Sequence, residues 1–199
     1  MADDALVDVA VAEAALPGQT ESGDAHLVAP YPGGVLVAAV DGLGHGSEAA
    51  HAARLACSVL ADDPGAELQD LFARVHARLV RSRGVAMSLA SFSRGGGLAW
   101  LGVGNVEGTL VRAANGPAGN PDSILLRGGV VGYQLPSLRP STTEVEPGDT
   151  LVFATDGVAG AHRREVDPAR PPGLLAEHLL SEFVKGADDA LVVVARYIG

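Results

Sequence analysis

Short runs of apolar residues, rich in Val and bounded by Gly or Pro, recur along most of this chain. Runs of this length and composition are typical of β-strands. They predict strands over residues 6–12, 25–29, 35–40, 85–92, 98–103, 108–113, 124–126, 142–145, 150–154 and 190–197. Clusters of Gly, Pro, Asn and Asp predict loops over residues 115–122 and 163–172.

Two stretches between the third and fourth predicted strands repeat their apolar residues at helical spacing. The first carries Ala52, Leu55, Ala56, Val59 and Leu60. Ser47 is its predicted N-cap, and the Pro64–Gly65 pair is expected to end it. The second carries Leu68, Leu71, Phe72, Val75 and Leu79. A third helix is expected over residues 173–184, and we interpret these apolar stripes as core packing.

Many strands with a few helices grouped into pairs indicate the α+β class. The strict βαβ alternation of a doubly wound parallel sheet is absent, so two packed sheets flanked by helices are the expected layering. The length of 199 residues fits one domain spanning 1–199. A chain of this size buries roughly 70% of the surface that it exposes when unfolded.

The charge balance is acidic, with 14 basic and 24 acidic residues and a net charge of −10. A field of this sign repels phosphate backbones and attracts divalent cations, so we expect no nucleic-acid partner. No apolar run reaches the ~18 residues of a membrane span, so we expect no membrane partner either. Residues 1–4 lack the basic start of a secretory signal, and Cys57 is the only cysteine. We therefore expect a soluble, monomeric, cytoplasmic protein.

Aspartates stand at the boundaries of four predicted strands. Asp41 and Asp156 directly follow apolar runs and precede glycine, Asp24 precedes a strand, and Asp188–Asp189 lead into the last strand. Any one Asp-Gly pair can simply be a turn. Four such sites together favour a cluster of carboxylates, the ligands that Mg²⁺ and Mn²⁺ prefer. From these residues alone, a metal site and a set of ordinary turns both stay open.

Several other chemistries lack their motifs. Lys185 is the only lysine and does not end a glycine-rich loop, which excludes a P-loop. The six histidines are scattered and no H-E-x-x-H occurs, which disfavours a zinc hydrolase. No G-x-S-x-G nucleophile elbow is present. Cys57 lies within the first predicted helix without an arginine-rich loop after it, so we interpret it as a core residue.

The order of these acidic motifs resembles that of a known enzyme family. Gly23-Asp24, the segment D-G-L-G-H-G at 41–46, Thr155-Asp156-Gly157 and Asp188-Asp189 occur in the order found in type 2C metal-dependent protein serine/threonine phosphatases. The D-G-x-G-H-G form followed by an Ala-rich helix is typical of the bacterial SpoIIE branch. The resemblance covers essentially the whole chain.

This resemblance implies a four-layer α-β-β-α sandwich of two antiparallel sheets, with two Mn²⁺ or Mg²⁺ ions at one edge. It implies that Asp41 bridges both ions and that the Gly42 carbonyl and Asp24 bind the second. Asp156 and Asp188 hold the first ion. Asp41 and Asp156 are then the catalytic residues, acting through a water that the ions share.

The resemblance places Asp189 and His45 beside the ligands. Many members of the family carry a histidine two residues after the bridging aspartate, where Leu43 stands here, so a structural role for His45 is expected over a role as general acid. No motif identifies the basic residue that receives the phosphate. The resemblance also implies phosphorylated STAS-domain stressosome proteins as substrates, with dephosphorylation resetting a bacterial stress signal. A catalytically inactive module that binds a signalling partner, and a phosphatase for small phosphoesters, stay open as alternatives.

Overall fold

The computed structural model describes residues 5–115 and 121–199. Its strands form two sheets. The first has the order β1-β11-β10-β6-β7 and the second β2-β3-β4-β5-β8, and β9 pairs with residues 97–100 of β5 while β8 pairs with residues 102–103. The strands span β1 Val7–Ala14, β2 Asp24–Tyr31, β3 Gly34–Gly42, β4 Val85–Ser93, β5 Gly97–Val103, β6 Glu107–Val111, β7 Asp122–Ser123, β8 Leu126–Arg127, β9 Ser141–Glu144, β10 Thr150–Ala154 and β11 Ala190–Tyr197.

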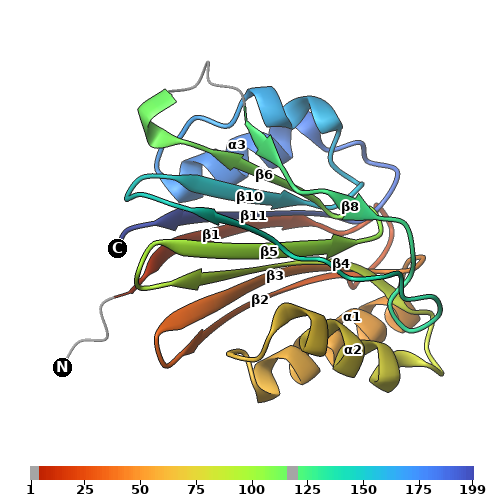
Figure 1. The fold of residues 1–199 in the computed structure, drawn as a ribbon. Coiled ribbons are helices and arrows are strands. Elements are labelled where there is room, and N and C mark those ends of the chain that lie inside the picture. Colours follow the sequence, from red (N-terminus) through yellow and green to blue (C-terminus); the bar gives the residue numbers. More distant parts are fainter. Residues whose placement is uncertain (1–4, 116–120) are drawn as a thin grey trace.

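Helices cover the outer face of each sheet (Figure 1). The helices are α1 Ser47–Asp62, α2 Leu68–Leu79 and α3 Pro172–Phe183, with short 3₁₀ turns η1 Ala113–Asn115 and η2 Gly160–Arg164. α1 and α2 pack on the second sheet, and α3 packs on the first. The predicted four-layer α+β sandwich is confirmed, with one departure: the short β5–β8 pairing is parallel. Of the helices that the structure describes, none is both long and apolar enough to span a membrane.

The central strands are buried on both faces because each separates two hydrophobic cores. Successive side chains of a strand point to opposite faces. In β3, Val35, Val37 and Ala39 enter the core between the sheets, whereas alternate residues face α1 and α2. In β11, Leu191 and Val193 enter the same central core, and their neighbours pack under α3. This double burial explains the continuous apolar runs, in place of polar-apolar alternation.

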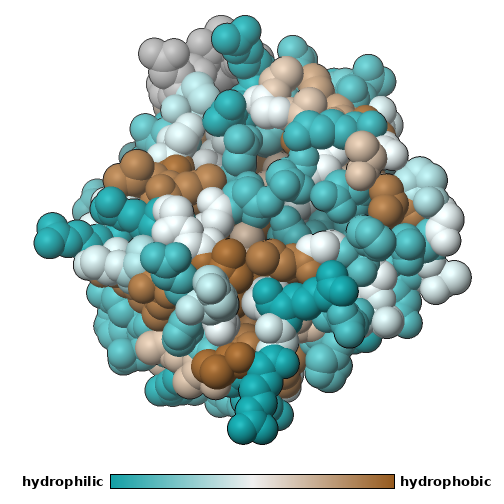
Figure 2. Space-filling model, turned by 90° about the vertical axis from the view of Figure 1, so that its right-hand side faces the viewer, coloured by the Kyte–Doolittle hydropathy of each residue, from teal (hydrophilic) through white to brown (hydrophobic). Residues whose placement is uncertain are grey.

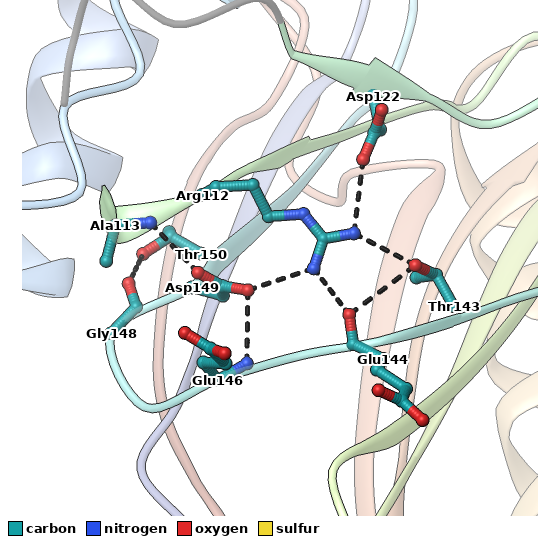
Figure 3. A network of polar contacts seen from close by, with 9 residues as sticks. All are labelled: Arg112, Ala113, Asp122, Thr143, Glu144, Glu146, Gly148, Asp149 and Thr150. Carbon is teal, nitrogen blue, oxygen red and sulfur yellow. Dashed lines mark hydrogen bonds and ion pairs between the residues drawn. The ribbon is translucent and has the colours of Figure 1, made fainter. Parts of the chain in front are cut away.

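A polar network joins the two sheets at one end of the sandwich (Figure 3). Arg112, just after β6, donates from Nη1 to Asp149 Oδ2 at 3.0 Å and from Nη2 to Thr143 Oγ1 in β9 at 2.9 Å. Asp149 is buried, and its Oδ1 accepts the Ala113 amide at 2.9 Å. Its Oδ2 also accepts the amide of Glu146 at 3.1 Å. Arg112 thus links the first sheet to β9, which belongs to the second.

Four sequence-based expectations need correction or qualification. Ser47 is not the N-cap of α1: Gly46 takes that position at φ 78°, and Ser47 is the first helical residue. In place of the predicted strand over 124–126, the structure has two short strands: β7 ends at Ser123 and β8 begins at Leu126. The predicted loop over 163–172 begins inside η2. Within the predicted loop over 115–122, residues 116–120 lie outside the described part of the chain, as do residues 1–4.

Cys57 packs beside the core under α1, consistent with its interpretation as a packing residue. Its Sγ lies 3.6 Å from the carbonyl oxygen of His26. Burial raises the pKa of the thiol to about 12. A thiol with so high a pKa is a poor nucleophile at neutral pH.

Candidate metal centre

The predicted aspartates meet at one end of the sandwich, where β3 and β10 finish and β2 and β11 begin. We call Asp24, Asp41, Asp156, Asp188 and Asp189 the carboxylate corner. This end lies opposite the chain's C-terminus, which Figure 1 shows at the far end of β11. The corner therefore draws residues from both sheets. Figure 2 shows that the surface at this end is mostly hydrophilic, with separate groups of apolar residues.

Strand pairing brings Asp24 and Asp41 together. The antiparallel register of β2 and β3 makes them direct partners. Asp24 is buried, with 8% of its surface exposed, and its Oδ2 accepts a hydrogen bond from Thr155 Oγ1 at 2.7 Å. Thr155 Oγ1 in turn accepts the Leu191 amide at 2.9 Å. Through this chain of hydrogen bonds, a strand of the second sheet is fixed against two strands of the first.

Burial and mutual repulsion raise the pKa of two of these carboxyl groups. For Asp24, burial and then the charge of Asp41 raise the pKa to about 8, against the lowering effect of the Thr155 hydrogen bond. For Asp41, burial and then the charge of Asp156 raise it to about 7, with smaller contributions from Asp188 and Asp189. Negative charge is therefore crowded at this corner, and a cation would relieve the repulsion.

Asp156 and Asp188 are exposed at the mouth of the corner. Asp156 Oδ2 accepts a hydrogen bond from Asn105 Nδ2 at 2.6 Å. Asp188 Oδ1 accepts the amide of Asp189 at 2.9 Å. The other oxygen of each carboxylate makes no hydrogen bond to any residue that the structure describes, so it is available to a ligand.

Asp189 has a different environment from the other four. It is buried, and its two oxygens accept the backbone amides of Leu16 and Gly23, each at 2.8 Å. Both oxygens are occupied by these donors. The carboxylate of Asp189 thus fixes the segment before β2, and with it the position of Asp24.

Two glycines allow the close backbone approaches that shape the corner. A Cβ on Gly42 would lie 2.2 Å from the Ala49 carbonyl oxygen at the start of α1. A Cβ on Gly157 would lie 1.9 Å from the Asp189 carbonyl oxygen. Real side chains do not approach so closely, so the D-G pairs are packing requirements here as well as turn signals.

The donor set fits a hard divalent cation. None of the five carboxylates forms an ion pair within the part of the chain that the structure describes. As the side chains stand, no group of three or more His, Cys, Asp or Glu residues among 5–115 and 121–199 is arranged to hold a metal ion by itself. Mg²⁺ sites commonly use one or two carboxylates and complete their shell with carbonyl oxygens and waters, so an open arrangement suits this ion.

Three residues near the corner are not among its five carboxylates. His45 is exposed in the loop between β3 and α1, next to the corner by sequence. Sequence reasoning missed Asn105, which contacts Asp156, and Lys185, whose Nζ donates to the backbone oxygen of Asp156 at 2.5 Å. Both come from loops far from Asp156 in sequence. The one sequence feature that could have drawn attention to Lys185 is that it is the only lysine of the chain.

Comparisons with known proteins agree with this architecture. The family model of stage II sporulation protein E (SpoIIE) matches residues 31–198. No curated protein sequence matches the chain. Among solved structures, a chain from work on the bacterial stressosome, "a modular system that has been adapted to control secondary messenger signaling", is 27% identical, with a TM-score of 0.86. That match covers 96% of this chain and 99% of the other.

Two further structures share the fold at lower identity. RsbX in complex with magnesium is 18% identical, with a TM-score of 0.84 over 96% of this chain and 95% of that one. The PP2C phosphatase domain and a regulatory fragment of SpoIIE from Bacillus subtilis are 19% identical, with a TM-score of 0.78 over 96% and 64%. The chain belongs to the SpoIIE family of PP2C-type protein serine/threonine phosphatases.

Proposed function

We propose that the carboxylate corner holds two divalent ions, Mn²⁺ or Mg²⁺, with which the chain hydrolyses phosphoserine and phosphothreonine in a protein substrate. Asp41 would bind both ions, the Gly42 carbonyl and Asp24 would help to hold one, and Asp156 and Asp188 would help to hold the other. The observation that carries this proposal is the crowding of carboxylates from both sheets without an ion pair among the described residues.

The chain's own residues orient the ligands. The Asn105 amide holds one oxygen of Asp156 and leaves the other available to a ligand. Thr155 holds Asp24, and Asp189 anchors the backbone before it. Bound divalent ions supply an activated water and screen the phosphoryl oxygens, so an acidic corner can accept a phosphorylated side chain. These hydrogen bonds restrict the motion of Asp24, Asp156 and Asp189 before any ion binds.

We further propose that the substrates are phosphorylated STAS-domain proteins of a stressosome, so that dephosphorylation resets a bacterial stress signal. The likeness to a chain from the bacterial stressosome, over nearly the full length of both, supports this assignment. The whole described chain, with both sheets contributing to one corner, supports a single catalytic unit.

The test is phosphate release from a phosphoserine-bearing STAS protein, with Mn²⁺, with chelator, and with the Asp41→Asn variant. Release is expected only with the metal, and the variant should lose more than about a hundredfold in kcat. Metal binding without release from any phosphoprotein would favour the binding module instead. Release of similar efficiency from small phosphoesters alone would point to the third alternative.

A further inference from the structure

A basic cleft lies between the start of α1 and the end of α2, outside the carboxylate corner. It has a volume of about 520 Å³. Arg78 in the last turn of α2 lines it together with Arg81 and Arg83 from the following turn. Glu48 and His51 of α1 form the opposite wall. We call this the arginine cleft.

The charges of the arginine cleft are largely unneutralised. Arg78 and Arg81 are exposed and make no hydrogen bond or ion pair with any residue that the structure describes. Arg83 pairs with Glu48 at 2.6 Å, but both side chains are at least half exposed, and such pairs are weak. Three guanidinium groups therefore face one acidic side chain, in a protein whose net charge is −10.

The arginine cleft continues directly from the loop that carries the predicted metal ligands. The amide of Leu43 donates to the carbonyl oxygen of Gly84 at 3.1 Å, next to Arg83. A Cβ on Gly44 would lie 2.6 Å from Arg83 Nη1, so this guanidinium rests on the loop after Asp41. A peptide whose phosphorylated residue reached the corner would pass its neighbouring residues over these arginines.

We propose that the arginine cleft binds an anionic segment of the phosphoprotein substrate, on one side of the residue that is dephosphorylated. The segment carries carboxylates or a second phosphate, because guanidinium groups recognise both by charge-assisted hydrogen bonds. This proposal rests on the proposed function for its substrate. It adds a basis for substrate selection: acidic residues near the phosphorylated residue raise the affinity of the chain for that substrate. This local attraction acts although the net charge of the protein repels anions.

Binding is tested with fluorescein-labelled peptides in chelator, so that the result is independent of metal and of turnover. Three peptides share one unphosphorylated serine and differ in its flank, which carries glutamates, a phosphoserine or glutamines. The glutamate and phosphoserine peptides should bind about tenfold more tightly than the glutamine peptide, and salt should weaken them. Whichever of these two peptides binds more tightly shows whether the cleft prefers carboxylates or a phosphate group.

The variant pair is Arg78→Gln/Arg81→Gln against Arg54→Gln/Arg74→Gln. The control removes the same amount of charge from exposed positions of α1 and α2 that lie outside the arginine cleft. The first variant should lose the preference for the anionic peptides, and the control should keep it. Equal affinities in the two variants, or no binding of the glutamate peptide to the wild type, would overturn the proposal.

Turnover separates this proposal from the proposed function. With Mn²⁺, the first variant should show a lower kcat/KM for a glutamate-flanked phosphopeptide, by about tenfold, and unchanged hydrolysis of p-nitrophenyl phosphate. If the wild type hydrolysed neither the phosphopeptide nor p-nitrophenyl phosphate but still bound the anionic peptides selectively, the proposed function would be refuted. The proposal for the arginine cleft would be unaffected. An equal loss of kcat/KM for the glutamine-flanked phosphopeptide would refute the arginine cleft alone.

Discussion

Asp24 and Asp41 are direct partners across β2 and β3, and the pKa of each is raised by burial and by neighbouring carboxylates, to about 8 and about 7. The folded, metal-free chain therefore binds protons at this corner that an unfolded chain releases at much lower pH. Proton binding and metal binding compete for the same oxygens. Because of this competition, the pH dependence of metal binding at the corner can be measured without any substrate.

Stability of the metal-free protein should depend on Asp24 in a defined direction. The folded pKa lies above the unfolded value of 3.8, so between these two values the folded state binds more protons. The contribution of Asp24 to the free energy of unfolding is therefore fully present below the unfolded pKa and is lost as pH rises toward about 8. Asp24→Asn should stabilise the metal-free protein at that pH by roughly 1–3 kcal/mol.

Urea unfolding in chelator at several pH values checks this prediction. The difference between wild type and variant should shrink as pH falls, because the wild-type carboxyl group then becomes neutral too. Added Mn²⁺ should stabilise the wild type more at high pH than at low pH and should stabilise Asp24→Asn less. A variant less stable than the wild type at every pH would contradict the assignment of burial as the cause.

His45 should be dispensable for catalysis. It is exposed, and no hydrogen bond to another described side chain holds it toward the corner. His45→Ala should change kcat by less than about threefold, whereas loss of a general acid costs about 10²–10⁴-fold. Steady-state turnover of a phosphopeptide measures this, with Asp156→Asn as the inactive reference. A loss of several hundredfold in kcat would restore His45 as the acid.

The Arg112–Asp149 network should matter for stability and not for chemistry. Asp149 is buried and accepts hydrogen bonds from Arg112 and from two backbone amides. Asp149→Ala leaves these donors unpaired and should lower the free energy of unfolding by about 3 kcal/mol. Asp122→Ala is the control, because Asp122 pairs with the same arginine but is mostly exposed, and it should cost less than about 1 kcal/mol. Chemical denaturation of the two variants measures both values.

Gly157 should tolerate no side chain. A Cβ there would meet the Asp189 carbonyl at 1.9 Å, so Gly157→Ala must displace either Asp156 or Asp189. We expect a loss of metal affinity of at least about tenfold, because either the proposed ligand Asp156 or the anchoring residue Asp189 moves. Gly173→Ala in α3 meets nothing within 4 Å and should leave affinity unchanged. Titration with Mn²⁺ compares them, and equal affinities would count against the packing argument.

Much of the fold follows from local sequence, and the differences have local causes. The β3 and β11 runs are apolar throughout, and both strands form where expected because each is covered on both faces. Ser47 was wrongly predicted as a cap because Gly46 adopts a positive φ that lets the chain enter α1 one residue earlier. Residues 124–126 are apolar, yet only Leu126 lies in a strand, because the chain crosses here from β7 in the first sheet to β8 in the second.

The candidate site is less accessible to sequence reasoning than the fold. The aspartates stand in recognisable motifs at strand ends, so their proximity could be expected. Asn105 and Lys185 carry no motif, because each reaches Asp156 only through the packing of one loop against another. The arginine cleft likewise depends on how α1 and α2 lie together, since Arg78, Arg81 and Glu48 have no regular spacing in the sequence.

The hydrogen bonds of Asp189 have a consequence for the order of folding. They join residue 189 to Leu16 and Gly23, across 173 and 166 positions of the chain. Contacts between such distant segments form late, because closing long loops costs entropy before other contacts compensate. A chain still being synthesised could form β2 and β3 before Asp189 has emerged, and the backbone before Asp24 would then lack its anchor. The Mn²⁺ binding that we propose would thus report the last stage of folding, after the two sheets have docked.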